Sequence, residues 1–179
     1  MIRHPTSSIR LALFGALALA LSAPASRAAD DPHAHHRHAD PTPGYKRQLA
    51  NYRIPELSLV RSDGKSVPFQ REIDDGRPVV LNLIFTTCTA VCPLLSQTVA
   101  QFRRKLGADA AAVHFISVSI DPEQDTPERL RAYAAQFGAD KDWTYFTGSV
   151  SASVTLQKGF QAYFGDTMHH RPVTFMRAA

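Results

Sequence analysis

The feature that most constrains this chain is the point where an apolar run meets its two cysteines, Cys88 and Cys92. Residues 79–85 are aliphatic and β-branched without clean alternation, which is typical of a strand buried on both faces of a sheet. Pro93 suits the first turn of a helix. The residues expected on the inner side of that helix are Leu94, Leu95, Val99, Phe102 and Leu106. Those expected to face solvent are Gln101, Arg103, Arg104 and Lys105. The pattern predicts a buried strand that leads through both cysteines into an amphipathic helix.

That location has chemical consequences for Cys88 and Cys92. The unpaired N–H groups and partial positive charge of a helix N-terminus favour thiolate over thiol. Thiolates bind soft metals and attack disulfides. A structural disulfide is the plain alternative, but closing so short a loop adds little entropic stabilisation. We therefore expect the pair to serve reactivity or metal binding.

The first 28 residues have the features of a secretory signal peptide. Arginines precede an apolar run at residues 11–21, and Ser26 and Ala28 occupy positions −3 and −1 of a cleavage site. We expect cleavage between Ala28 and Ala29, and export to the periplasm. The alternative is an uncleaved membrane anchor, although the apolar run is shorter than the roughly 20 residues that a spanning helix needs.

Charge gives no sign of nucleic-acid binding. The formal net charge is +4, from 20 basic and 16 acidic residues. Without the three arginines of residues 1–28, 17 basic residues remain and the charge falls to +1. Residues 29–48 are polar and proline-rich, which predicts a flexible linker. It holds His33, His35, His36 and His38, which can collect transition metals loosely or can be incidental residues of a solvated tail.

The domain expected at residues 49–179 alternates strands and helices. Strands are predicted at 52–60, 79–85, 113–120, 143–147 and 172–176, with the run at 67–69 continuing the first apolar pattern. After the cysteine helix, which Gly107 ends, one helix is predicted from an N-cap at Thr126 to Gly138 and another from Ser151 to Gly165. His114 is interpreted as a structural histidine. This order indicates a three-layer α/β domain with a central mixed sheet, and a reactive cysteine pair at a strand-to-helix junction makes it thioredoxin-like.

A histidine just before the last predicted strand adds a third candidate ligand. Soft thiolates with one imidazole suit Cu(I) and tolerate Cu(II), whereas zinc usually takes a fourth protein ligand or water. Thioredoxin-type oxidoreductases more often carry two residues between their cysteines, not three. The spacing favours metal binding without deciding it.

Two motifs and the late histidine make residues 79–177 similar to the Sco/SenC family of copper-binding assembly factors, which have a thioredoxin fold. The motifs are TCTAVCP at 87–93 and SVSIDPEQDTP at 117–127. The resemblance implies that Cys88, Cys92 and a histidine bind copper, and that the copper serves the binuclear copper centre of respiratory cytochrome c oxidase. His170 lies three residues before Val173 and is preferred to His169 as the ligand. Asp121 and Asp125 are interpreted as shaping the site or capping the loop.

The leading hypothesis is a periplasmic, membrane-proximal copper metallochaperone that passes copper to an oxidase subunit. Other envelope copper chaperones or thiol reductants are further expected partners. The alternative is a thiol–disulfide oxidoreductase with a redox-active disulfide, in which Cys88 is the nucleophile and Cys92 resolves. A weaker idea, a peroxiredoxin-like peroxidase, lacks the proline expected before Cys88. One departure stands out: thioredoxin-like domains usually continue with another strand and a final helix, whereas this sequence stops at Ala179, so we expect either a truncated C-terminus or a domain without those elements.

Overall fold

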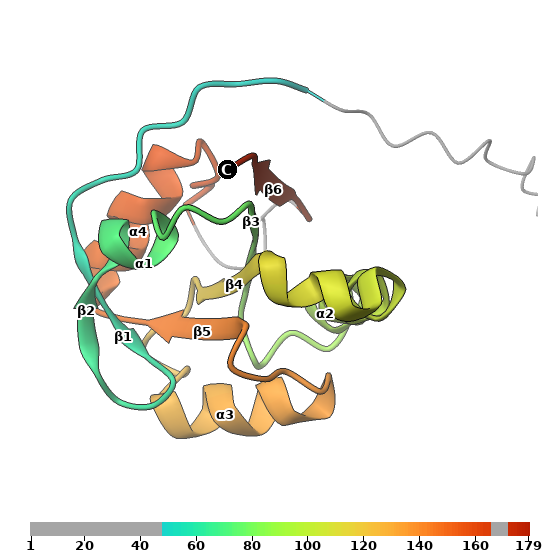
Figure 1. Cartoon of the computed structure of the whole chain (residues 1–179). Coiled ribbons are helices and arrows are strands. Elements are labelled where there is room, and N and C mark those ends of the chain that lie inside the picture. Colours follow the sequence, from blue (N-terminus) through green and yellow to red (C-terminus); the bar gives the residue numbers. More distant parts are fainter. Residues whose placement is uncertain (1–47, 166–171) are drawn as a thin grey trace, which may run out of the picture. The chain divides into compact units, whose positions relative to one another are not determined.

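A mixed sheet of six strands organises the part of the chain that the computed structural model describes, residues 48–165 and 172–179. The strands are β1 (Ser58–Arg61), β2 (Ser66–Pro68), β3 (Val79–Ile84), β4 (His114–Ser119), β5 (Trp143–Thr147) and β6 (Thr174–Arg177). Their order across the sheet is β2-β1-β5-β4-β3-β6. β3, β4 and β5 are parallel neighbours, whereas β1, β2 and β6 pair antiparallel with theirs (Figure 1).

The predicted strand ahead of the cysteines is confirmed. All six residues of β3 are buried, and so are all six of its parallel partner β4. The register pairs Val79 with His114 and Ile84 with Ser119. Parallel strands covered on both faces carry continuous apolar runs, which is why neither strand alternates in sequence. The carboxyl ends of β3 and β4 consequently lie side by side, and the segments that follow both strands meet there.

Helices cover both faces of the sheet. The helices are α1 (Phe69–Ile73), α2 (Val91–Leu106), α3 (Pro127–Gln136) and α4 (Val150–Gly159), and a 3₁₀ helix spans Gly107–Ala112. Phe102 of α2 packs on Phe115, and Tyr133 of α3 packs on Tyr145, on one face. Phe69 of α1 packs on Phe146 on the other face, where Phe160 after α4 meets Phe175 of β6. The three layers are thus as predicted.

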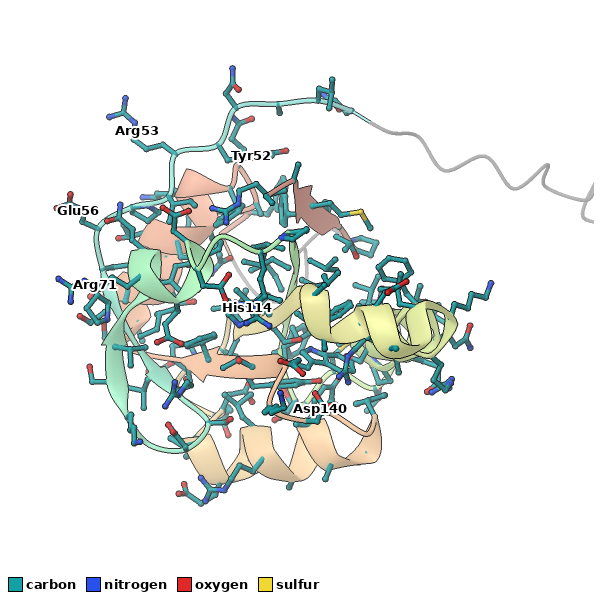
Figure 2. The ribbon with its side chains drawn as sticks, in the orientation of Figure 1. Tyr52, Arg53, Glu56, Arg71, His114 and Asp140 are labelled. Carbon is teal, nitrogen blue, oxygen red and sulfur yellow. The ribbon has the colours of Figure 1, made fainter. Side chains whose placement is uncertain are left out.

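Helix α2 begins at Val91, so Cys92 lies in its first turn and Cys88 in the segment before it. Two predictions for its faces are wrong. Leu94 was expected inside but is 66% exposed. Arg103 was expected in solvent, yet its guanidinium stacks over the rings of Phe115 and Trp143. Arg103 also pairs with Asp140, which Figure 2 labels.

The starts of the last two helices test the capping predictions. Thr126 caps α3 as predicted, with its hydroxyl accepting from Arg129 N–H. Ser149, not Ser151, caps α4, because it is the Ser149 hydroxyl that accepts from Ala152 N–H. The same helix ends at Gly159 and not at Gly165. A Cβ at Gly159 would lie 2.7 Å from the carbonyl oxygen of Arg53.

The first predicted strand is shorter than expected. Only its end becomes β1, and the preceding segment, which contains Pro55, is irregular. The apolar continuation at 67–69 also changes type, because Phe69 opens the five-residue helix α1. Its ring is completely buried against Phe146. Tertiary packing decides the state of so short an apolar segment more than its local pattern does.

Candidate metal centre

A tight turn carries the chain from β3 to the first cysteine. The amide of Cys88 donates to the carbonyl oxygen of Phe85, 3.2 Å away, which closes a four-residue turn with Thr86 and Thr87 in the middle. Helix α2 starts three residues after Cys88 and brings Cys92 back to the same place. The two cysteines are not joined in a disulfide; Cys88 is half-buried and Cys92 fully buried.

The first helical turn points its N–H groups at the Cys88 sulfur. The amide of Cys92 donates to Cys88 Sγ across 3.4 Å. Burial by itself raises the pKa of the Cys88 thiol, but backbone N–H groups of Cys92, Ala90 and Val91 outweigh it and hold the pKa below its ordinary value. The expectation of a thiolate-favouring helix terminus is therefore met at Cys88.

The second cysteine has the opposite tendency. Burial raises the pKa of the Cys92 thiol to about 12, and the neighbouring Cys88 adds to the rise. One helical turn further on, the buried hydroxyl of Ser96 lies 3.0 Å from that of Tyr133. Burial raises the pKa of Tyr133 to about 12. The two cysteines are thus asymmetric. The half-buried Cys88 sulfur tends to form a thiolate, whereas the buried Cys92 sulfur stays protonated.

The turn ahead of Cys88 rests on a buried carboxylate. Asp125 is 0% exposed and accepts hydrogen bonds from the amide of Thr86, at 3.1 and 3.2 Å, and from the Thr86 hydroxyl. Ser119, the last residue of β4, donates its hydroxyl to the same carboxylate at 2.6 Å. Sequence analysis named Asp125 but missed Thr86 and Ser119. The available signal was that Thr86 directly precedes the first motif and that Ser119 lies within the second.

Asp121 lies on the same loop, half-buried. Its amide donates to the Ser119 hydroxyl at 3.0 Å. Burial raises the pKa of the Asp121 carboxyl, and the charge of Asp125 raises it further.

Within residues 48–165 and 172–179, His, Cys, Asp and Glu side chains form no group of three that could hold a metal ion.

The structure therefore describes some of the predicted ligands and not others. The structure brings Cys88 and Cys92 together, whereas His169 and His170 lie outside the described residues, as do His33, His35, His36 and His38. The cysteine pair fits a soft metal, because it offers two sulfurs, not joined in a disulfide, at one point of the fold. Its third ligand stays a prediction.

His114 lies at the opposite end of β4 from Ser119, and its contacts are with other residues than those of the cysteine site. It begins β4 and is buried (Figure 2). Its Nε2 lies 3.3 Å from the hydroxyl of Thr144, and its Nδ1 lies 3.2 Å from the carboxylate of Asp75. These are the contacts of a structural histidine, as predicted.

No helix in the described part of the chain is long and apolar enough to cross a membrane. The predicted signal peptide, residues 1–28, and linker lie almost wholly outside the described residues. From Leu49 onward the described residues belong to one compact unit.

Two curated proteins similar to this chain have names that refer to SCO1 or to copper binding. The chain is 33% identical over 99 residues to an SCO1 protein homolog of Bacillus subtilis, covering 55% of this chain and 50% of that protein. It is 33% identical over 90 residues to a Stutzerimonas stutzeri protein named for copper binding, covering 48% and 42%. The chain thus spans half or less of the length of these curated relatives.

Solved structures agree on the fold. BsSco, described as a member of the Sco family of cytochrome c oxidase assembly proteins with a disulfide switch, matches with a TM-score of 0.60 at 26% identity, over 73% of this chain and 80% of that one. Bradyrhizobium japonicum ScoI with copper bound matches with a TM-score of 0.60 at 24% identity, over 68% and 80%. The thioredoxin-like fold is therefore confirmed. The SCO1/SenC family model matches residues 47–176, and the chain belongs to that family.

Proposed function

We propose that this chain is a copper metallochaperone of the cell envelope. It holds one copper ion, Cu(I) or Cu(II), through Cys88, Cys92 and His170, and helps to assemble the copper centre of cytochrome c oxidase. The observation that carries the proposal is the pair of cysteines, not joined in a disulfide, at the start of α2. Family membership and relatives that bind copper or assemble the oxidase support it.

The unequal exposure of the two sulfurs suits transfer by ligand exchange. The half-buried Cys88 is open to an incoming ligand of a recipient, whereas Cys92 is enclosed. A recipient sulfur or imidazole that replaces Cys88 first leaves the ion held by the remaining ligands. The recipient proposed is a copper-receiving oxidase subunit, with other envelope copper chaperones or thiol reductants as further partners.

The envelope location rests on residues 1–28, whose features are those of a signal peptide. The mature domain, residues 49–179, would then follow a His-rich linker at 29–48. Mass spectrometry of the exported protein checks this, with Ala29 expected as the first residue. An intact N-terminus in the exported protein would contradict cleavage and favour the anchor.

The test of the copper site is an anaerobic Cu(I) titration of reduced residues 29–179 against a competing chelator. We expect one tight copper per chain, lost in Cys88→Ala and weakened at least about tenfold in His170→Ala, because each removes a ligand. His169→Ala is the matched control and should bind nearly as wild type. Tight binding that ignores all three substitutions would assign the copper to the His-rich linker and overturn the site.

A second candidate function, a thiol–disulfide oxidoreductase, is favoured by the asymmetry of the cysteines. A nucleophile needs thiolate character and access, which Cys88 has, and a resolving cysteine can be buried, as Cys92 is. His170→Ala separates the two functions. It should weaken copper binding and leave the reduction of a partner's disulfide by Cys88 and Cys92 largely intact. Rapid exchange without tight copper binding in the wild type would favour the oxidoreductase.

A further inference from the structure

Asp125 is a buried carboxylate whose partners are all neutral. Its side chain accepts from the Thr86 amide, the Thr86 hydroxyl and the Ser119 hydroxyl. Within the described residues no ion pair involves it. A charge taken out of water is costly unless hydrogen bonds replace its hydration. Three donors converging on one 0%-exposed carboxylate therefore make a built polar cluster, and not a chance contact.

One end of this cluster holds the cysteine turn. Thr86 is the second residue of the turn that Phe85 and Cys88 close, and its amide and hydroxyl both bind Asp125. The amide of a second turn residue has no partner within the turn itself. Asp125 supplies that partner, so Thr86 cannot rotate without breaking two hydrogen bonds. Fixing Thr86 fixes the direction in which the chain reaches Cys88.

The other end is anchored in the sheet. Ser119 ends β4, is 1% exposed, and pairs with Ile84 of β3. Its hydroxyl donates to Asp125 and accepts from the Asp121 amide. The Asp125 amide in turn donates to the carbonyl oxygen of Asp121 at 2.9 Å. The carboxylate therefore belongs to a loop that is held by hydrogen bonds to the end of β4 and within itself. This loop contacts the cysteine turn through Thr86.

We propose that Asp125 is a positioning residue of the metal site, which clamps Thr86 from the end of β4 so that the Cys88 sulfur stays beside the amide of Cys92. The inference rests on the proposed function in that copper is taken as the ion held. The clamp makes no contact with the metal. It keeps the two sulfurs in one arrangement before the ion arrives, which lowers the ordering cost of binding.

The variants remove hydroxyls and leave the carboxylate in place. Thr86→Val and Ser119→Ala each delete one donor to Asp125. Ser117→Ala is the matched control, because Ser117 is also a buried β4 residue, but its hydroxyl donates to Asn82 and accepts from the Trp143 indole. Thr86→Ser restores the hydroxyl and tests rescue. Thr86 is only half-buried, so its variants keep the test valid if Ser119→Ala does not fold.

The first measurement is amide hydrogen exchange of the reduced, copper-free protein by NMR. The Cys92 amide reports directly on the clamp, because it donates to the Cys88 sulfur. We expect its exchange to quicken at least tenfold, relative to the amides of β4, in Thr86→Val and Ser119→Ala. Ser117→Ala and Thr86→Ser should keep the wild-type ratio. An unchanged ratio in the first two variants, or an equal change in Ser117→Ala, overturns the clamp.

The second measurement is Cu(I) affinity by chelator competition. We expect at least a tenfold loss in Thr86→Val and Ser119→Ala and recovery in Thr86→Ser. Faster exchange of the Cys92 amide without any loss of affinity would overturn the role in metal binding. If wild type binds no Cu(I), the proposed function fails on its own, while the exchange ratios still decide whether Asp125 positions the cysteine turn.

Discussion

At the scale of single residues, the two cysteines are chemically unequal although they occupy one short motif. Cys88 receives an N–H of the first helical turn, whereas Cys92 is enclosed by the core. The sequence indicates that both lie at a helix start. It does not indicate which sulfur the helix N–H groups point at, because that depends on the turn at Thr86 and on a carboxylate 39 residues further along the chain.

The same inequality predicts selective alkylation. In reduced, copper-free protein at pH 7, iodoacetamide should modify Cys88 at least about tenfold faster than Cys92, because Cys88 is accessible and its pKa is held below the ordinary thiol value. Burial keeps the Cys92 thiol protonated, with its pKa raised to about 12. Peptide mass spectrometry after short labelling measures both rates. Denatured protein is the control, and equal rates in the folded protein would contradict the structure.

At the scale of elements, local pattern predicted the buried strands and the two helices beside the site. β3 and β4 carry continuous apolar runs, and Thr126 with Pro127 marks the start of α3. Prediction failed where two local signals compete or where packing decides. Ser149 and Ser151 can each cap a helix, and the five-residue helix α1 exists because the Phe69 ring fills the core against Phe146.

The cap of α4 gives a stability prediction. Ser149→Ala should lower the free energy of unfolding by about 1 kcal/mol, because the first turn loses the acceptor for the Ala152 amide. Ser151→Ala, the matched control at the residue that the sequence favoured, should cost clearly less, since Ser151 is exposed and its side chain caps no amide. Urea unfolding curves of both variants decide it. An equal loss in the two variants would mean that the hydrogen bond between the Ser149 and Ser151 hydroxyls contributes more to stability than the bond from the Ala152 amide to Ser149.

At the scale of the whole molecule, the sequence was sufficient for the layer order, the family and the place of the cysteines, because these depend on hydrophobic pattern and on motifs. The Asp125 cluster was beyond it, since its donors come from the turn after β3 and from the last residue of β4, which meet only in the folded sheet. The sequence predicted a structural His114 in a buried strand but not its contact with Asp75 in the turn before β3. That burial links global stability to pH.

His114 predicts a loss of stability in mild acid. Burial lowers the pKa of the His114 imidazole below its usual 6.5, the charge of Asp75 partly opposes this, and that of Arg77 adds to it. Below pH 6.5 the unfolded chain therefore binds the proton more readily than the folded one, so stability is constant above that pH and falls as pH drops through the window beneath it. The slope from this group is at most about 1.4 kcal/mol per pH unit.

His114→Gln isolates this contribution, because glutamine keeps polar atoms for Thr144 and Asp75 without titrating. Urea unfolding at pH 7.5, 6.5 and 5.5 should show the wild type losing more stability across the interval than the variant. The carboxylates whose pKa is lowered in the fold, such as Asp63 with a pKa of about 2 beside Arg61, lose their contribution only at lower pH. They therefore do not mask the difference. Parallel pH profiles for wild type and His114→Gln would show that the imidazole is free to protonate in the folded protein, and would contradict its burial.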